Sequence, residues 1–216
     1  MRTRIVLVGA GGHARVIIDM LKADPTIELV GCVSANLADP AVLGVPILGG
    51  DEILHALIRN ELKSAFVAVG DNRNRVRLLR NLKELGFTTI NAISRDATVS
   101  SGVQIGAGVA IMPGSVVNVG TVIGDGVIVN TGAIVDHDCR IGAGAHIAPG
   151  ARIAGRVIVG EGAFLGTGCS VIPGISIGSW TTVGAGAAVV RNLPEGVVAF
   201  GVPARVQKQL DVLLKK

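Results

Sequence analysis

Aromatic side chains are nearly absent from this chain of 216 residues, which contains four Phe, one Trp and no Tyr. Protein modules that bind single-stranded RNA or DNA stack bases on exposed aromatic rings, so that class is disfavoured. Charge is sparse too, at 17% of residues and a net charge of +4. This weak positive charge favours phosphorylated or acidic ligands, and we expect no nucleic-acid partner.

Cysteines are too few and too widely spaced for a disulfide framework. Cys32, Cys139 and Cys169 instead favour a reducing compartment, and we expect a cytoplasmic protein. No run approaches the roughly 18 apolar residues of a membrane-spanning helix, so no membrane segment is expected. The apolar stretch near the N-terminus passes directly into a glycine turn, and we interpret it as a first strand and not as a signal peptide.

Glycine, with 31 residues, and branched aliphatic side chains are abundant, and the hydrophobic fraction of 49% excludes intrinsic disorder. The pattern of the chain changes near residue 90. We therefore expect an α/β nucleotide-binding domain over residues 1–90 and an all-β domain over residues 91–216.

Strands and helices alternate in the first of these domains. Apolar runs predict strands over 5–8, 27–33 and 65–69, and helical spacing predicts helices over 14–22 and 74–85. This order predicts a small parallel sheet with right-handed crossovers. Four arginines form a run at the start of the second helix, and their spacing suits a solvated helix face; a phosphate contact is the alternative. They are Arg73, Arg75, Arg77 and Arg80.

A glycine turn of sequence GAGGHA, from Gly9 to Ala14, lies between the first strand and the first helix. It has the G-x-G-x-x-A form of a nucleotide-binding turn, in which glycines let backbone N–H groups approach phosphates at a helix N-terminus. A dinucleotide site also needs an acidic residue at the end of the second strand, where this chain has Ser34-Ala35-Asn36. A nucleotide site is therefore predicted, whereas an NAD-dependent dehydrogenase, one alternative function, is disfavoured.

Every sixth residue from Ile93 to Val189 is Ile, Val or Leu, which gives 17 aliphatic residues at a fixed period. Hexapeptide periodicity predicts a parallel β-helix, in which about three hexads close one triangular coil. Burial of all these side chains contributes on the order of 30 kcal/mol before the entropy of ordering is subtracted. No lysine occurs between Lys83 and Lys208, and a prism so poor in charge is suited to packing against copies of itself.

His137 lies two residues after a core aliphatic, in a register that is mostly polar, small or proline. We therefore expect its ring outside the prism; an idle surface histidine is the alternative. The neighbouring carboxylates of Asp136 and Asp138 are able to orient the ring and stabilise its charged form, although Asp136 alternatively only solubilises an edge. Gly155 lies one coil after His137 and should stack about 4.8 Å from it. It is either a functional residue or a glycine that only forms the corner.

The hexads, the closing sequence from Gly201 to Arg205 and the glycine turn together resemble the PglD/NeuD-type sugar acetyltransferases. These are hexapeptide-repeat acyltransferases that use acetyl-CoA, and the resemblance spans nearly the whole chain. It implies a left-handed parallel β-helix with a short C-terminal helix, and a homotrimer with active sites between subunits. It further implies an N-acetyltransferase whose acceptor is the amine of a 4-amino-4-deoxy sugar linked to UDP, GDP or dTDP, which attacks the thioester directly.

The same resemblance implies a role for individual residues. His137 would act as the general base, tuned by Asp138, and Gly155 would hold the thioester carbonyl. The residues expected to bind the nucleotide sugar are Gly9, Gly11, Gly12, His13, Ser34, Asn36, Gly70, Asn72, Arg75 and Asn130. The residues expected to bind acetyl-CoA are His146, Gly155, Thr167, Ala185, Gly201, Pro203 and Arg205.

His146 lies half a coil from His137, so the two can serve one site only if they come from different chains. We expect no metal site, because β-helix carbonic anhydrases bind zinc with three histidines and this prism carries two. Cys139 fits packing better than nucleophilic catalysis, His13 alternatively caps a helix, and His55 is given no role. A sialic acid O-acetyltransferase and a non-enzymatic nucleotide-binding scaffold are the remaining alternatives.

Overall fold

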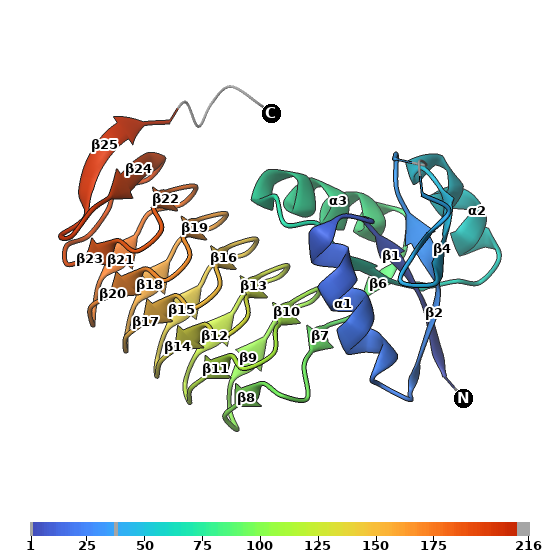
Figure 1. Ribbon diagram of the computed structural model, residues 1–216, viewed down its shortest axis with the longest axis horizontal. Helices are drawn as coiled ribbons and strands as arrows, with labels where there is room; N and C mark the ends of the chain where they lie inside the picture. Colours follow the sequence, from blue (N-terminus) through green and yellow to red (C-terminus); the bar gives the residue numbers. More distant parts are fainter. Residues whose placement is uncertain (1, 37–38, 211–216) are drawn as a thin grey trace. The chain divides into compact units, whose positions relative to one another are not determined.

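The computed structural model describes residues 2–36 and 39–210. The chain divides into two compact units between Ala92 and Ile93 (Figure 1). Each unit has a hydrophobic core of its own, which is built from aliphatic side chains with almost no aromatic rings.

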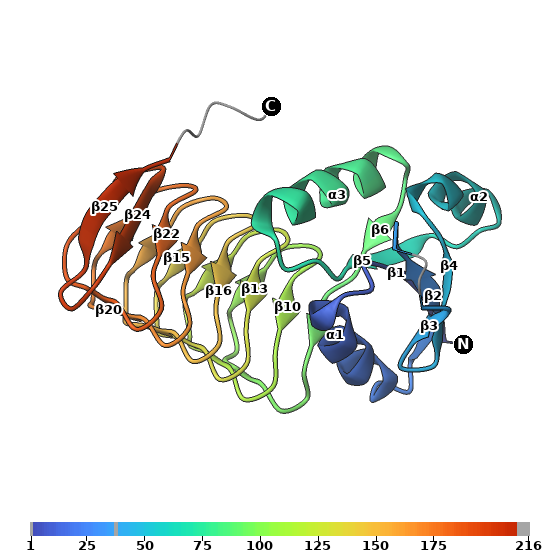
Figure 2. The same cartoon turned by 45° about the horizontal axis from the view of Figure 1, so that its top comes forward.

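The N-terminal unit is built on a six-stranded sheet with the order β3-β4-β2-β1-β5-β6 (Figure 2). Its strands are β1 (Thr3–Val8), β2 (Ile27–Val33), β3 (Ala41–Val42), β4 (Val45–Gly49), β5 (Ser64–Val67) and β6 (Thr88–Thr89). Neighbours are parallel except for β3, which is antiparallel to β4. The predicted parallel sheet is therefore wrong at this edge: Leu43 and Gly44, with φ of 48° and 75°, form a two-residue hairpin turn that reverses the chain.

Helices α1 (Gly12–Lys22), α2 (Leu54–Arg59) and α3 (Asn72–Glu84) and a 3₁₀ turn (Asp51–Ile53) connect these strands. Both predicted helices are present, and each begins two residues earlier than predicted. Asp71 sets the start of α3, because its Oδ1 accepts a hydrogen bond from the Asn74 N–H at 2.8 Å. The buried face of α3 includes Arg75, which is 1% exposed; the prediction that it lies on a solvated face with its neighbours is wrong.

The C-terminal unit is a parallel β-helix in which each coil of 18 residues contributes a two-residue strand to each of three sheets. The eight-stranded sheet contains β7 (Ala92–Ile93), β10 (Ala110–Ile111), β13 (Ile128–Val129), β16 (His146–Ile147), β19 (Phe164–Leu165), β22 (Thr182–Val183), β24 (Val197–Phe200) and β25 (Arg205–Gln209). The six-stranded sheet contains β8 (Thr98–Val99), β11 (Val116–Val117), β14 (Ile134–Val135), β17 (Arg152–Ile153), β20 (Ser170–Val171) and β23 (Ala188–Val189). The five-stranded sheet contains β9 (Gln104–Ile105), β12 (Val122–Ile123), β15 (Arg140–Ile141), β18 (Ile158–Val159) and β21 (Ser176–Ile177).

The hexad aliphatics fill this prism from Ile111 to Val189, where each is at most 3% exposed. Stacked parallel sheets with such a core are typical of the predicted left-handed β-helix. The first coil departs from the prediction: Ile93 is 45% exposed, and Val99 and Ile105 are only partly buried. These residues lie on β7, β8 and β9, the edge strands of their sheets, so no preceding coil packs over them.

The chain closes the prism with a hairpin, in which β24 extends the eight-stranded sheet and β25 pairs with it in antiparallel fashion. The predicted short C-terminal helix does not include Arg205–Gln209, which form a strand because the open edge of β24 provides hydrogen-bond partners for an extended segment. Residues 211–216, to which the prediction also applies, lie outside the described residues. Within the described ranges, no helix is long and apolar enough to cross a membrane.

Candidate active site

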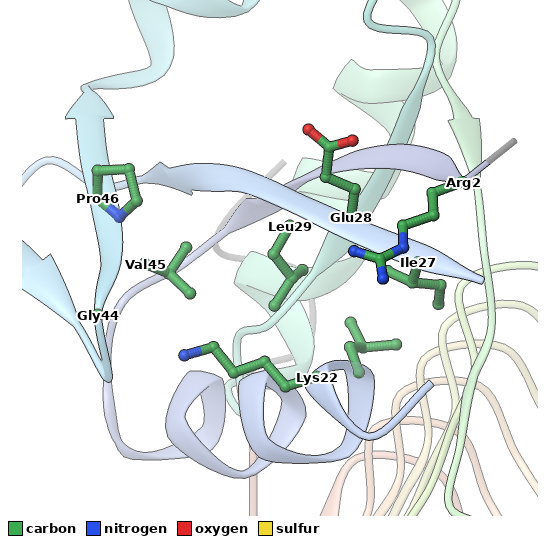
Figure 3. Close-up of a pocket in the computed structure, with 9 residues that line it drawn as sticks. Arg2, Lys22, Ile27, Glu28, Leu29, Gly44, Val45 and Pro46 are labelled. Carbon is green, nitrogen blue, oxygen red and sulfur yellow. The ribbon is translucent and has the colours of Figure 1, made fainter. Parts of the chain in front are cut away.

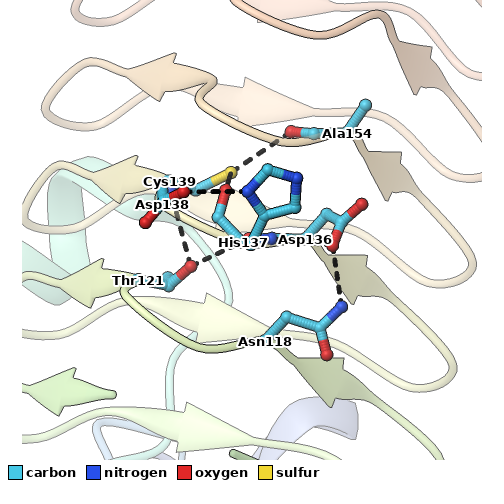
Figure 4. A network of polar contacts seen from close by, with 7 residues as sticks. All are labelled: Asn118, Thr121, Asp136, His137, Asp138, Cys139 and Ala154. Atoms are coloured by element: carbon cyan, nitrogen blue, oxygen red, sulfur yellow. Dashed lines mark hydrogen bonds and ion pairs between the residues drawn. The ribbon is translucent and has the colours of Figure 1, made fainter. Parts of the chain in front are cut away.

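Residues Asp136–Cys139 form the corner between β14 and β15, here called the His137 corner (Figure 4). The His137 side chain lies outside the prism and is 45% exposed, and its Nδ1 is 2.9 Å from Asp138 Oδ2. Asp138 adopts a left-handed backbone conformation, with φ of 58°. Since a carboxylate only accepts, Nδ1 carries the hydrogen and Nε2 of the neutral ring keeps a free lone pair.

Gly155 lies against the His137 ring from the following coil. A β-carbon at Gly155 would lie 2.5 Å from Nε2 and 2.6 Å from Cε1, so no side chain fits there while the ring keeps this position. The N–H of Gly155 has no hydrogen-bond partner within the described part of the chain. Its equivalent in the preceding coil, the N–H of His137, is bound by Asp136 Oδ1, whereas the residue before Gly155 is Ala154, whose side chain accepts nothing. An unused backbone donor therefore lies beside the imidazole.

Asp136 binds the main chain of His137. The sequence had left open that this carboxylate only makes an edge of the prism soluble. Its Oδ1 accepts hydrogen bonds from Asn118 Nδ2 and from the His137 N–H, both at 2.8 Å. The bond from Asn118, followed by the bond from His137, lowers the pKa of the Asp136 carboxyl. Asn118 was missed by the sequence analysis; the signal was its place one coil before Asp136.

Cys139 is buried at the end of the same corner, and its Sγ lies 3.2 Å from the Ala154 carbonyl oxygen. Burial, as the main cause, raises the pKa of this thiol. A reactive cysteine needs a lowered pKa and exposure, so Cys139 is a packing residue.

His146 and Asn130 form a second cluster, on the eight-stranded sheet and the corner that follows it. Asn130 Oδ1 accepts the Thr131 N–H at 2.8 Å, so Asn130 Nδ2 is the donor to His146 Nε2 at 2.9 Å. The His146 ring is buried and meets Phe164 edge to face, with 5.2 Å between centroids. The structure thus joins a residue predicted to bind sugar to one predicted to bind acetyl-CoA, and it places both away from the His137 corner of the same chain.

The other residues predicted to bind acetyl-CoA are exposed and divide between two places. Thr167 and Ala185 lie one coil apart on the corner that also carries Asn130 and Thr131. The remaining three lie in or beside the turn of the C-terminal hairpin: Gly201, Pro203 and Arg205.

In the N-terminal unit, the predicted nucleotide residues gather where the neighbouring strands β2, β1 and β5 end. Glycine is required at position 9 because the loop after β5 passes close to it: a β-carbon there would lie 2.6 Å from the Ala68 carbonyl oxygen. At Gly11, Gly12 and Gly70 a β-carbon would meet no atom within 4 Å. Folding therefore does not require glycine at these three positions, and their backbones are open to a ligand at the carboxyl edge of the sheet.

His13 and Arg75 lie beside these glycines. Burial, followed by the positive charge of Arg75, lowers the pKa of His13 to about 4, so the ring is neutral near pH 7. Its buried Nε2 has no hydrogen-bond partner among the described residues. Arg75 itself donates to the carbonyl oxygens of Val69 and Gly70 and to Asn72 Oδ1, at 3.1, 3.0 and 2.9 Å, and burial lowers its pKa to about 10. Arg75 and Asn72 thus shape the loop after β5 from inside the protein.

Ser34 and Asn36 form the turn after β2. The Asn36 N–H donates to Ser34 Oγ at 3.2 Å, and the Ser34 N–H donates to the Gly49 carbonyl oxygen at 2.8 Å. This turn occupies the place where a dinucleotide site would carry an acidic residue.

A hollow at the opposite, amino edge of the same sheet is lined by residues that include Arg2, Lys22, Glu28 and Val45 (Figure 3). It contains none of the predicted site residues. Ligands of such folds bind at the carboxyl edge, so this hollow does not enter the candidate site. Over the described chain, no group of three or more His, Cys, Asp or Glu side chains is arranged to hold a metal ion.

Two sequence families match this chain: the PglD N-terminal domain over residues 4–82, and the bacterial transferase hexapeptide (six repeats) over residues 120–155. Among solved structures, PerB from Caulobacter crescentus, in complex with CoA and GDP-perosamine, is 50% identical, with a TM-score of 0.90 over 94% of this chain and 97% of that chain. The acetyltransferase domain of PglB from Neisseria gonorrhoeae FA1090 is 38% identical, with a TM-score of 0.91 over 95% and 100% of the two chains. Comparison with curated proteins gave no match.

The fold and the two family matches define a hexapeptide-repeat acyltransferase with an N-terminal α/β unit. The chain belongs to the family of PglD-type sugar N-acetyltransferases that includes PerB and the PglB domain.

Proposed function

We propose that this enzyme transfers the acetyl group of acetyl-CoA to the amine of a nucleotide-linked 4-amino-4-deoxy sugar. The observation that carries the proposal is the His137 corner, where an outward imidazole has Nδ1 on Asp138 and lies against Gly155. The relative in complex with CoA and GDP-perosamine makes GDP-perosamine the first acceptor to test, with UDP- and dTDP-linked amino sugars after it.

His137 acts as the general base in this reaction. Acetyl-CoA supplies the acetyl group as a thioester; the amine nitrogen forms the new bond to the acetyl carbon, and the carbon–sulfur bond breaks. His137 Nε2 accepts a proton from the attacking amine and returns it to the departing sulfur, which leaves as the thiol. Asp138 keeps Nδ1 protonated and stabilises the charged ring, so Nε2 is the ring nitrogen that accepts the proton of the amine. No covalent bond to the enzyme forms.

Gly155 supplies a hydrogen bond in the same step. Its N–H has no partner in the described chain, and it lies beside the ring that receives the proton. An oriented backbone donor of this kind stabilises the oxygen of the acetyl group as it gains negative charge. Because Gly155 has no side chain, the space beside the His137 ring stays open.

The nucleotide binds at the carboxyl edge of the N-terminal sheet. Gly9, Gly11, Gly12 and Gly70 present backbone there, and α1 directs its N-terminus to the same edge, which favours a diphosphate. Because His13 is neutral, its ring contributes a hydrogen bond and not a charge. Ser34 and Asn36 flank the nucleotide in place of a carboxylate.

The active enzyme is a homotrimer in which two corners from neighbouring subunits enclose acetyl-CoA. One subunit provides His137 and Gly155, and its neighbour provides the corner with Asn130, His146, Thr167 and Ala185; the C-terminal hairpin from Gly201 to Arg205 holds the distal part. The proposal is supported by the separation of these residues onto different corners of one chain. Cys32, Cys139 and Cys169 are free and buried, which supports a reducing, cytoplasmic location.

The test is a panel of GDP-, UDP- and dTDP-linked 4-amino sugars, with their 4-hydroxy counterparts and sialic acid, assayed with acetyl-CoA by thiol release. An amine acceptor should release thiol and gain one acetyl group by mass, and the hydroxyl counterparts should not. Faster thiol release with the hydroxyl acceptors would instead make the enzyme an O-acetyltransferase. If none of the acceptors leads to thiol release, the result would support the non-enzymatic binding scaffold.

A further inference from the structure

Asn118 and Asp136 occupy equivalent places in successive coils of the β-helix. Asn118 directly follows β11, and Asp136 directly follows β14, the strand that pairs with β11. Their main chains are already joined, because the Asn118 N–H donates to the Val135 carbonyl oxygen at 2.9 Å. The Asn118 side chain adds a further bond that the β-helix does not require, from Nδ2 to Asp136 Oδ1 (Figure 4).

The Asp136 carboxylate receives its two donors on one atom. Oδ1 accepts from Asn118 Nδ2 and from the His137 N–H, each at 2.8 Å. Both donors favour the ionised form of Asp136, in agreement with its lowered pKa. Asn118 therefore fixes the rotation of a carboxylate whose second contact is the backbone of the catalytic base.

Thr121, on the same preceding coil, fastens the corner at a second point. Its Oγ1 donates to the Asp136 carbonyl oxygen at 2.8 Å and accepts from the Cys139 N–H at 3.2 Å, and the residue is fully buried. Thr121 thus holds the first and last residues of the four-residue corner. The Asn118–Asp136 pair adds the bond on the N–H of His137 itself.

We propose that Asn118 is a positioning residue for acetyl transfer, which acts through Asp136 to hold the backbone of His137. The proposal rests on the proposed function for its kinetic consequence. Asn118 makes no contact with the ring, so its removal should lower kcat and leave the KM of both substrates nearly unchanged. A small displacement of a positioned base is enough to lower a rate by one to two orders of magnitude.

Asn118→Asp is the sharpest test, because the side chain keeps its shape while the donor becomes a second carboxylate facing Asp136. At pH 8 the two carboxylates repel, and we expect kcat to fall about 30-fold, compared with about 5-fold for Asn118→Ala, which removes the bond without repulsion. The double variant Asn118→Asp with Asp136→Asn leaves a single carboxylate and so removes the repulsion, while Oδ1 of the amide at 136 still accepts the hydrogen bond from the His137 N–H. We expect this variant to recover to within about 5-fold of the unmodified enzyme.

The matched control is Gln104→Glu, which introduces the same chemical change at an exposed position on the prism and should leave kcat unchanged. The proposal is overturned if Asn118→Asp keeps kcat within 2-fold of the unmodified enzyme, or if the double variant is no better than the poorer single variant. A fall in thermal stability with an unchanged kcat also overturns it.

Hydrogen exchange of the His137 backbone N–H provides a readout that needs no activity. We expect exchange at least about 10-fold faster in Asn118→Asp and restored protection in the double variant, because this N–H depends on Asp136. If the unmodified enzyme releases no thiol, the proposed function fails while this measurement still decides the positioning role. Unchanged exchange in Asn118→Asp overturns the proposal whatever the activity.

Discussion

The imidazole of His137 lies so close to Gly155 of the next coil that a β-carbon there would be 2.5 Å from Nε2. The position of the imidazole and the open backbone donor beside it therefore depend on a residue without a side chain. Both belong to one corner of the prism, and the parallel ladder of the β-helix sets their separation.

Gly155→Ala should displace the ring, because the added methyl group and Nε2 cannot occupy the same space. We expect kcat to fall by about 100-fold or more, since the base loses its place. Thiol release measures the effect, and a thermal melt checks the fold. Gly102→Asn, at an open left-handed position where Asn is tolerated, is the control and should remain active. Activity of Gly155→Ala within 3-fold of the unmodified enzyme would contradict this role.

Asp138→Asn should lower kcat by about 100-fold, because an amide does not stabilise the charged imidazole as a carboxylate does. Asn also tolerates the left-handed backbone that Asp138 adopts, so the fold should remain intact. Glu161→Gln, on an exposed part of the prism, is the comparison variant. Equal rates for the two variants would show that the Asp138 carboxylate has no part in the reaction.

His13 should make the stability of the protein depend on pH between about 6.5 and 4. Its pKa is lowered from 6.5 to about 4 on folding, so the unfolded chain binds a proton over this range and the folded chain does not. Stability therefore falls as pH decreases through this range, by at most about 3 kcal/mol from this group. His13→Gln should flatten the curve measured by urea unfolding, and the exposed His55→Gln should not. Parallel curves for His13→Gln and the unmodified chain would contradict the assignment.

Arg75→Leu should destabilise the N-terminal unit by about 3 kcal/mol, because it leaves two carbonyl oxygens and Asn72 Oδ1 without their buried donor. Urea unfolding measures the loss, and Arg80→Leu, on the exposed side of the same helix, should change stability by less than about 0.5 kcal/mol. A similar small change in both variants would mean that the buried guanidinium has no structural role.

The β-helix was predictable from the sequence because its signal is local and repeated: the same aliphatic register recurs in every coil. The outward position of His137 follows from the same register. Ile93 has the same signal but lies on an edge strand, and nothing in the hexad itself marks the end of a solenoid. The position of Arg75 on the inner face of α3 was missed because arginine spacing alone does not show which carbonyl groups need a buried donor.

The polar contacts of the candidate site were predictable in part. Asp138 follows His137 directly in the sequence, so its contact with the ring could be predicted from the sequence alone. The contact of Asp136 with Asn118 joins residues one full coil apart, and it becomes visible only when side chains in the same column are compared. Asn130 was assigned to the sugar and His146 to acetyl-CoA without any sign that the two contact each other.

The most direct measurement compares kcat for thiol release from acetyl-CoA by His137→Asn and by the unmodified enzyme, with a nucleotide-linked 4-amino sugar as acceptor and His55→Asn as control. If His137 accepts the proton of the amine, its replacement should lower kcat by about 100-fold or more while His55→Asn remains fully active. A His137→Asn enzyme that acetylates the amine at a rate within a few-fold of the unmodified enzyme would contradict the account.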